Sequence, residues 1–366
     1  MLAHVLRRAR QAASGGPDDA WEVLQEARAH GRAAFDAALV LLSSDEAADR
    51  SLGCHLLVVL CNPDEEEWGR EVATVMAGLA VGEHDAEVLC CLATALGFAR
   101  HRLGLPALVG LSTHPDSDVR QQAAQALPSC AEGADGVLLS ATLLALMADP
   151  DDDVRDWATF GLGTLTDFDG PAVREGLVIC MGDENLEVRD EALLGLARRR
   201  DPRLVAFLVA RLEEESVGML AVEAATYARD DRLFATLQEL TTWWDVDSDL
   251  LAEALSACDP AQQARDLADQ QAFLVAIEPY LQARPGVRVA LVCERFELDV
   301  SLSVHDSRGS ATYSLPNLLH RAGGDIASAV QAVVANLSES LLQPVKVDSV
   351  APRNRLIGGH EPVSTT

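Results

Sequence analysis

The protein has 366 residues, 49% hydrophobic and 23% charged, with 29 basic and 57 acidic side chains and a formal net charge of −28. So many apolar residues exclude an intrinsically disordered chain, and 25 glycines and 15 prolines exclude a collagen-like or low-complexity composition. The first 271 residues carry 21 basic and 48 acidic side chains, so they hold nearly all of the net charge. An acidic surface repels phosphate, which argues against a nucleic-acid partner.

The cysteines and the hydropathy of the chain indicate the cellular compartment of the protein. The eight cysteines lie in apolar stretches without a C-x-x-C pair or a zinc-type Cys/His spacing, so we expect reduced core thiols. The first eight residues, MLAHVLRR, do not lead into a long apolar segment, and no uncharged run of about 18 residues occurs in the chain. We therefore expect a cytoplasmic protein that does not contact membranes.

Residues 1–81 have the apolar patterning of helices. Apolar helical runs occur around 21–29, 34–42 and 51–60, and Asp45-Glu46 stands where a helix cap belongs. We interpret this region as degenerate N-terminal helical repeats with a capping unit, because the end of a repeat array needs a polar outer face.

Residues 82–271 contain one short pattern several times. Taking the aliphatic residue that ends each copy as the marker, the copies are 31, 35, 34, 29 and 33 residues apart, a period that predicts a solenoid. The copies are Asp85-Ala86-Glu87-Val88, Asp116-Ser117-Asp118-Val119, Asp151-Asp152-Asp153-Val154, Asn185-Leu186-Glu187-Val188, the weaker Glu214-Glu215-Ser216-Val217, and Asp247-Ser248-Asp249-Leu250.

Each copy has the composition of a helix start. Asp or Asn is a preferred N-cap, the acid two residues later suits the helix dipole, and the aliphatic residue opens a buried stripe. Small residues such as Gly161 and Gly195 follow, where neighbouring helices must approach closely. Another apolar helical segment precedes each cap, for example 138–147. The sequence therefore predicts two antiparallel helices per repeat.

The run PDSDVRQQAAQAL at 115–127, PDDDVR at 150–155 and EVR at 187–189 resemble HEAT repeats of the bacterial phycobilin-lyase type. The resemblance implies an α-α superhelix whose Val-Arg helices line the concave side. It also implies that acids and arginines bond between neighbouring repeats. The residues carried over as this structural ladder are Asp118, Arg120, Asp153, Arg155, Glu187 and Arg189. The copies at Val88, Val217 and Leu250 lack the arginine, so the ladder is interrupted there.

Residues 272–350 differ from the repeats. From about 284 the apolar period changes to two, with alternation over 296–304, another strand at 288–293 and turn residues at 306–310 before 311–315. Helices are expected near 316–321 and 325–342. We predict a small C-terminal α+β unit with a β-hairpin, which packs on its helices, on the last repeat or on a second copy as a homodimer. Residues 351–366 have the composition of a flexible tail.

The sequence lacks the common motifs of catalytic sites. The sequence has no H-E-x-x-H, G-x-S-x-G, Walker or G-x-G-x-x-G motif, so we assign no catalytic residue, metal or cofactor. His84, His101 and His114 lie near repeat junctions and could meet in space, but a lone junction histidine is more often a surface or capping residue.

Tryptophans and arginines are the candidate partner-binding residues. Trp157 follows Arg155 closely in a Val-Arg helix, the composition of an interface hot spot, although it could equally be a core residue. Adjacent residues of a helix cannot both face one core, so Trp243-Trp244 leaves one tryptophan exposed unless both are buried across a repeat junction, which we favour. Arg189 completes the set, and the basic run 198–200 reads as a helix C-terminus.

Three functions fit these features. The leading hypothesis is a non-enzymatic scaffold or adaptor whose acidic solenoid groove binds a basic protein or peptide. A narrower alternative is a neutralising, immunity-type partner of a basic effector, in which charge speeds association. A different class is a lyase or glycosylase-like enzyme on a HEAT scaffold, which the acidic charge and the absence of identifiable chromophore or catalytic residues disfavour.

Overall fold

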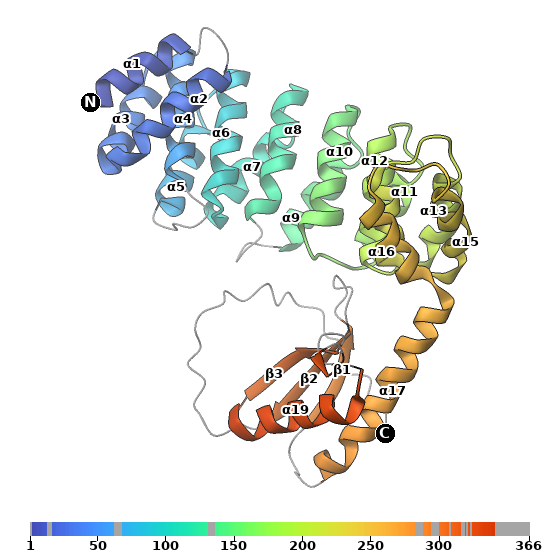
Figure 1. Ribbon diagram of the computed structural model, residues 1–366. Coiled ribbons are helices and arrows are strands. Elements are labelled where there is room, and N and C mark those ends of the chain that lie inside the picture. The colour runs from blue at the N-terminus through green and yellow to red at the C-terminus, as the bar shows by residue number, and fades with distance from the viewer. Residues whose placement is uncertain are drawn as a thin grey trace. The chain divides into compact units, whose positions relative to one another are not determined.

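The computed structural model describes residues 2–12, 17–61, 68–130, 136–282, 288–293, 300–306, 309–315, 319, 321–322 and 324–340. The chain divides into two compact units, Met1–Ala192 and Leu193–Thr366. Figure 1 shows the helices of both units and the strands near the C-terminal end of the described chain. None of the described helices is both long and apolar enough to cross a membrane.

The first unit is an array of antiparallel helix pairs. In each pair the second helix packs on its own partner and on the second helix of the next pair, so that α4, α6, α8 and α10 form a continuous row of second helices. The helices are α1 (Leu2–Ala12), α2 (Pro17–Gln25), α3 (Arg32–Leu42), α4 (Ala47–Leu60), α5 (Gly69–Leu79), α6 (Ala86–Ala99), α7 (Leu105–Leu111), α8 (Ser117–Ala126), α9 (Gly136–Leu146), α10 (Asp152–Phe160), α11 (Pro171–Cys180) and α12 (Leu186–Arg198), whose last turns belong to the second unit.

The predicted caps begin these helices. The carboxylates of Asp85 and Asp151 accept hydrogen bonds from the N–H of Val88 and Val154, and Asp116 accepts from the N–H of Asp118. Each cap satisfies a backbone donor that the first turn leaves unpaired. The expectation of a mostly helical repeat array is confirmed.

Small residues let the helices approach closely, as the sequence indicates. A Cβ added to Gly161 would lie 3.0 Å from Cγ of Pro128, and one added to Gly97 would lie 3.2 Å from Cβ of Ala126. Both positions are at crossings between neighbouring repeats, so a larger side chain there would push two second-helix segments apart.

The second unit continues with two further pairs and a long helix, α13 (Val205–Leu212), α14 (Met219–Ala228), α15 (Phe234–Leu240), α16 (Ser248–Cys258) and α17 (Pro260–Gln282). Asp247 caps α16 as predicted. The weaker copy at 214–217 does not cap a helix: α14 begins two residues after Val217, with Gly218 at the N-cap and no side-chain cap bond. That part of the prediction is wrong because none of its acids reaches the free N–H groups of α14.

The C-terminal part of this unit combines strands with helix α19 (Ile326–Ser340). Strands β1 (Arg288–Cys293), β2 (Val300–Asp306) and β3 (Gly309–Ser314) form an antiparallel sheet in the order β1-β2-β3, with Leu291 opposite Leu302 and Ser303 opposite Thr312. A separate core joins α17 and α19 through Phe273, Ile277, Leu315, Ala329, Val330 and Val333. Residues 294–299, most of the helix expected near 316–321, and the expected tail at 351–366 lie outside the described residues.

Candidate functional site

Arginines at the start of two second helices connect consecutive repeats. Arg120 on α8 donates from Nε and Nη2 to the carboxylate of Asp149, both at 2.8 Å, while its Nη1 donates to the carbonyls of His114 and Pro115. The guanidinium thus bridges the turn before its own helix and the turn of the following repeat. A bidentate arginine–carboxylate pair of this kind fixes orientation as well as distance.

Arg155 on α10 repeats this arrangement. Its Nε and Nη2 donate to Asp183 at 2.8 and 2.9 Å, and its Nη1 donates to the carbonyls of Asp149 and Pro150. Four hydrogen bonds therefore hold Arg155 inside the array, which leaves its guanidinium poorly placed to serve a partner.

A third bidentate arginine–carboxylate pair, here called a fork like the pairs of Arg120 and Arg155, lies in the N-terminal repeats, where the sequence predicts none. Arg50 on α4 donates to both carboxylate oxygens of Glu83 at 2.7 and 3.0 Å and to two loop carbonyls. The Arg50 guanidinium, helped by the backbone N–H groups of His84 and Asp85, lowers the pKa of Glu83 to about 2.

The acids of the ladder differ from those that the resemblance implied. Asp118, Asp153 and Glu187 are exposed in the first turns of their helices. The acids that receive the arginines stand two residues before each cap, at Glu83, Asp149 and Asp183. The implied pairs are incorrect because a first-turn acid lies beyond the turn into which the arginine reaches.

A sequence signal for these acids exists. The spacing acid-x-cap occurs before α6, α10 and α12, each time after a repeat whose second helix carries the arginine. Before α8 the same position is His114, and the preceding repeat has Leu89 in place of arginine. Nδ1 of His114 instead accepts a hydrogen bond from the N–H of Asp116.

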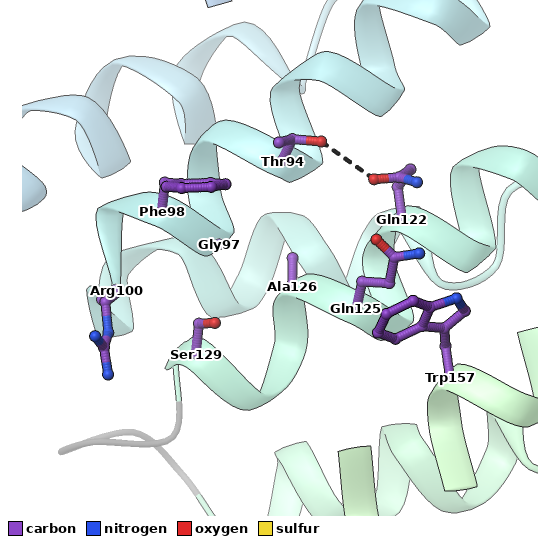
Figure 2. A pocket seen from close by; sticks show the side chains of 9 residues that line it. All are labelled: Thr94, Gly97, Phe98, Arg100, Gln122, Gln125, Ala126, Ser129 and Trp157. Atoms are coloured by element: carbon purple, nitrogen blue, oxygen red, sulfur yellow. Dashed lines mark hydrogen bonds between the residues drawn. The ribbon is translucent and has the colours of Figure 1, made fainter. Parts of the chain in front are cut away.

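A hollow opens on the row of second helices (Figure 2). Its volume is about 340 Å³, and it is lined from three successive helices of the row and the segments that follow them. The lining residues are Thr94, Gly97, Phe98, Arg100, Gln122, Gln125, Ala126, Ser129 and Trp157. Thr94 Oγ1 donates to Oε1 of Gln122 at 3.1 Å, which leaves the Gln122 amide nitrogen directed away from Thr94.

An acidic cluster surrounds Asp156, the residue that precedes Trp157 in α10. Oδ1 of Asp156 is buried and has no hydrogen-bond partner among the described residues. Desolvation, together with the charges of Glu187, Asp153 and Asp152, raises the pKa of Asp156 to about 6. This carboxylate lies among like charges, and no arginine or lysine of the described residues forms an ion pair with it.

Family comparisons match this part of the chain. Models described as HEAT repeat and HEAT repeats match residues 105–134 and 140–228. These residues are HEAT repeats.

Curated relatives and solved structures extend the comparison. Protein YibA of Escherichia coli, in strains K12 and O157:H7, is 33% identical over 113 residues, 31% of this chain and 40% of YibA. The chain thus spans well under half the length of these relatives in sequence. The X-ray structure of YibA superposes with a TM-score of 0.56 at 23% identity and covers 70% of this chain and 92% of that one, which shows a shared fold.

A looser likeness is to the complex of CpcE and CpcF of phycocyanin lyase from Nostoc sp. PCC7120. The TM-score is 0.38 at 15% identity, covering 71% of this chain and 94% of that one. At this TM-score the likeness says nothing about the activity of the present chain.

The remaining candidate residues occupy different places in the HEAT repeats. Trp157 is half-buried beside Phe160, with ring centroids 5.8 Å apart, and its indole borders the hollow. Arg189 on α12 makes no fork: its Nε is buried without a hydrogen-bond partner among the described residues.

The two adjacent tryptophans are not both buried. They lie in the turn after α15 rather than on a helix, so they are free to point apart. Trp244 is 5% exposed and donates from Nε1 to the carbonyl of Val217 at 2.8 Å, whereas Trp243 is 48% exposed. The favoured interpretation, burial of both, is wrong.

The histidines and the basic run have local roles. Nδ1 of His101 accepts the N–H of Leu103, as His114 does for Asp116. Within the described residues no group of three metal-ligating side chains is assembled. Arg199 donates from Nη1 to the carbonyl of Gly195 at the end of α12, and Arg200 has a φ of 49°, the left-handed conformation that ends a helix.

Proposed function

We propose that the protein is a non-enzymatic scaffold whose HEAT repeats bind a basic protein or peptide on the row of second helices. The observation that carries the proposal is Asp156, a carboxylate with a buried, unpartnered oxygen in acidic surroundings. Such a group costs stability in the free protein, and a lysine or arginine from a partner would relieve that cost.

The neighbourhood suits a cation. Trp157 follows Asp156 on α10 and is half-buried, so the same helix offers a partner's basic residues both a carboxylate and an aromatic ring. The acidic excess of the first 271 residues adds a long-range attraction that speeds encounter with a basic partner.

The best-placed nucleophile pair supports a binding role over an enzymatic one. Sγ of Cys91 lies 3.4 Å from Nε2 of His55, a geometry in which a histidine can activate a thiol. Burial raises the pKa of Cys91 to about 11 and lowers the pKa of His55. At neutral pH the thiol therefore stays protonated and weakly nucleophilic.

The test is binding of fluorescent arginine-rich and glutamate-rich peptides to the full chain at low and high salt. We expect the basic peptide alone to bind, with an affinity that falls as salt rises. Asp156→Asn should weaken binding about tenfold, because a charge-assisted contact at a partly desolvated site is lost. Glu239→Gln, which removes the same charge from an exposed position on α15, should bind as wild type. Equal binding of both peptides, or binding that ignores salt, would overturn the proposal.

A further inference from the structure

The hollow on the row of second helices presents a set of unused hydrogen-bonding groups. Gln125 makes no side-chain hydrogen bond among the described residues, and the Gln122 amide nitrogen keeps both of its donors because Thr94 occupies only the oxygen. Ser129 and the Trp157 indole N–H lie at the same rim without a described partner. Polar groups fixed in this way, but not used by the fold, are available to a ligand.

The arrangement of these groups favours an extended chain. The two carboxamides and the indole lie along α8 and α10, and the aromatic rings of Phe98 and Trp157 stand on opposite sides of the hollow, as Figure 2 shows. A carboxamide offers a donor and an acceptor that match one peptide group. The floor is made of Gly97 and Ala126, which allow a backbone or side chain to approach. A small molecule in so open a hollow would leave much of its surface in water.

Charge differs between the helices on the two sides of the hollow. Arg100 is exposed at the α6 side, with no described partner for its guanidinium, while α10, which provides Trp157 on the other side, also carries the acids Asp152, Asp153 and Asp156. A segment that crosses the hollow from α6 to α10 therefore runs from a cation toward a helix that carries carboxylates.

We propose that this hollow is a peptide subsite of the binding face, in which Gln122 and Gln125 hold the backbone of an extended partner segment and an aromatic or large apolar side chain lies between Phe98 and Trp157. The charge gradient sets the direction of the segment: its basic residues lie toward Asp156, and an acidic residue or a terminal carboxylate lies toward Arg100. This inference rests on the proposed function and specifies which basic peptides are selected.

The test uses an immobilised array of arginine-containing peptides probed with the full chain. One half of the array carries a phenylalanine beside the arginines, and the other half has alanine at that position. We expect wild type to prefer the phenylalanine peptides about tenfold, and Trp157→Ala to abolish the preference. Gln125→Met and Gln122→Met, which keep size but remove the carboxamide, should each weaken binding several-fold.

Matched variants separate positioning from direct contact. Thr94→Val removes the hydroxyl that orients Gln122, so it should weaken peptide binding about as much as Gln122→Met does. The losses from Thr94→Val and Gln125→Met should add in the double variant. Peptides with a glutamate placed before or after the basic residues test the direction. One order should bind several-fold better than the other, and Arg100→Ala should remove that difference.

The outcomes distinguish the two proposals. If basic peptides bind wild type and the glutamine and tryptophan variants equally, the hollow is not the subsite, whereas the basic-partner function stands. If no basic peptide binds wild type at any salt, the proposed function fails and this inference fails with it. Thermal unfolding of each variant, expected to be unchanged for Gln122→Met and Gln125→Met, shows that any lost binding is not lost folding.

Discussion

Three bidentate arginine–carboxylate pairs connect repeats in the first unit, whereas two such pairs in the second unit are local. Arg50, Arg120 and Arg155 reach carboxylates 33, 29 and 28 residues further along the chain. In the second unit, Arg203 and Arg232 fork onto aspartates only two residues before them. Paired charges therefore fix the spacing between several helix pairs of the first unit, including those of α8 and α10, which both line the hollow.

The position that carries the arginine shows why the units differ. In the first unit the arginine stands four residues after the N-cap of its helix. The same position in α14 and α16 holds Val222 and Leu251, both buried. These repeats of the second unit thus use an aliphatic contact where α4, α8 and α10 of the first unit use an ion pair, and they should depend more on apolar packing.

The largest effect tests that dependence on packing. Trp244→Ala should destabilise the second unit by about 3 kcal/mol, because it removes a buried aromatic ring and orphans the Val217 carbonyl. Trp244→Phe should cost about 1 kcal/mol by losing only the hydrogen bond and a little volume. Urea unfolding with Trp243→Ala as control should show little change for the exposed neighbour. A similar loss for both alanine variants would contradict this account.

A smaller effect tests the inter-repeat forks. Asp149→Ala leaves the Arg120 guanidinium without its carboxylate at a site where both side chains are largely buried, so we expect a loss of about 2 kcal/mol. Hydrogen exchange should quicken in α8 and α10 together, since the fork joins their repeats. Arg232→Ala breaks an exposed local fork and should leave exchange and the unfolding midpoint unchanged. Equal responses of the two variants would remove the distinction between the units.

The sequence predicts what depends on contacts within a few residues. A cap such as Asp151 bonds to an N–H three residues away, so its identity and spacing suffice to place the start of a helix. The repeat period follows from the recurrence of such caps. The failure at Val217 is local too, because an acidic run without a cap geometry resembles a weak copy of the pattern.

The ladder and the hollow depend on contacts between repeats, and the sequence does not predict most of these contacts. The ladder acids were placed in the first turn, although Asp149 and Asp183 stand two residues before the caps, where only the neighbouring repeat gives them a role. Trp157 was identified by composition alone. Gln122 and Gln125 share a face of α8 because they are three residues apart, but the hollow that they line forms only when three helices are stacked.

A third prediction concerns the stability that the folded protein loses by burying the ionised carboxylate of Asp156. Its pKa of about 6 lies above its ordinary value of 3.8, so the folded protein binds more protons than the unfolded chain between these values. Stability contributed by this group is therefore lost as pH rises from about 4 to 6. Asp156→Asn should stabilise the first unit above pH 6 by about 1 kcal/mol, a value reduced for the partial exposure of the side chain, and should have no effect near pH 4.

Binding of a basic peptide should depend on pH in the opposite sense to stability. The basic peptide should bind wild type more tightly at pH 7.5 than at pH 5, because the carboxylate that receives its cation ionises in between, while Asp156→Asn should be insensitive to pH. Thermal unfolding and peptide titration across this range measure both. A variant that is less stable than wild type at neutral pH would show that Asp156 has an intramolecular cation.

The last prediction concerns Glu83, whose contribution to stability depends on pH with the reverse sign. Arg50 and two backbone N–H groups hold the pKa of Glu83 at about 2, below its ordinary value of 4.5, so its contribution to stability is complete above pH 4.5 and is lost as pH falls toward 2. Glu83→Gln should lower the thermal midpoint at neutral pH and flatten its decline between pH 4.5 and 2. An unchanged slope in the variant would mean that the Arg50 fork does not hold its repeats together in solution. The pKa values of the ladder acids and of Asp156 are thus shifted in opposite directions, because the ladder acids face an arginine within the fold whereas Asp156 is desolvated among like charges.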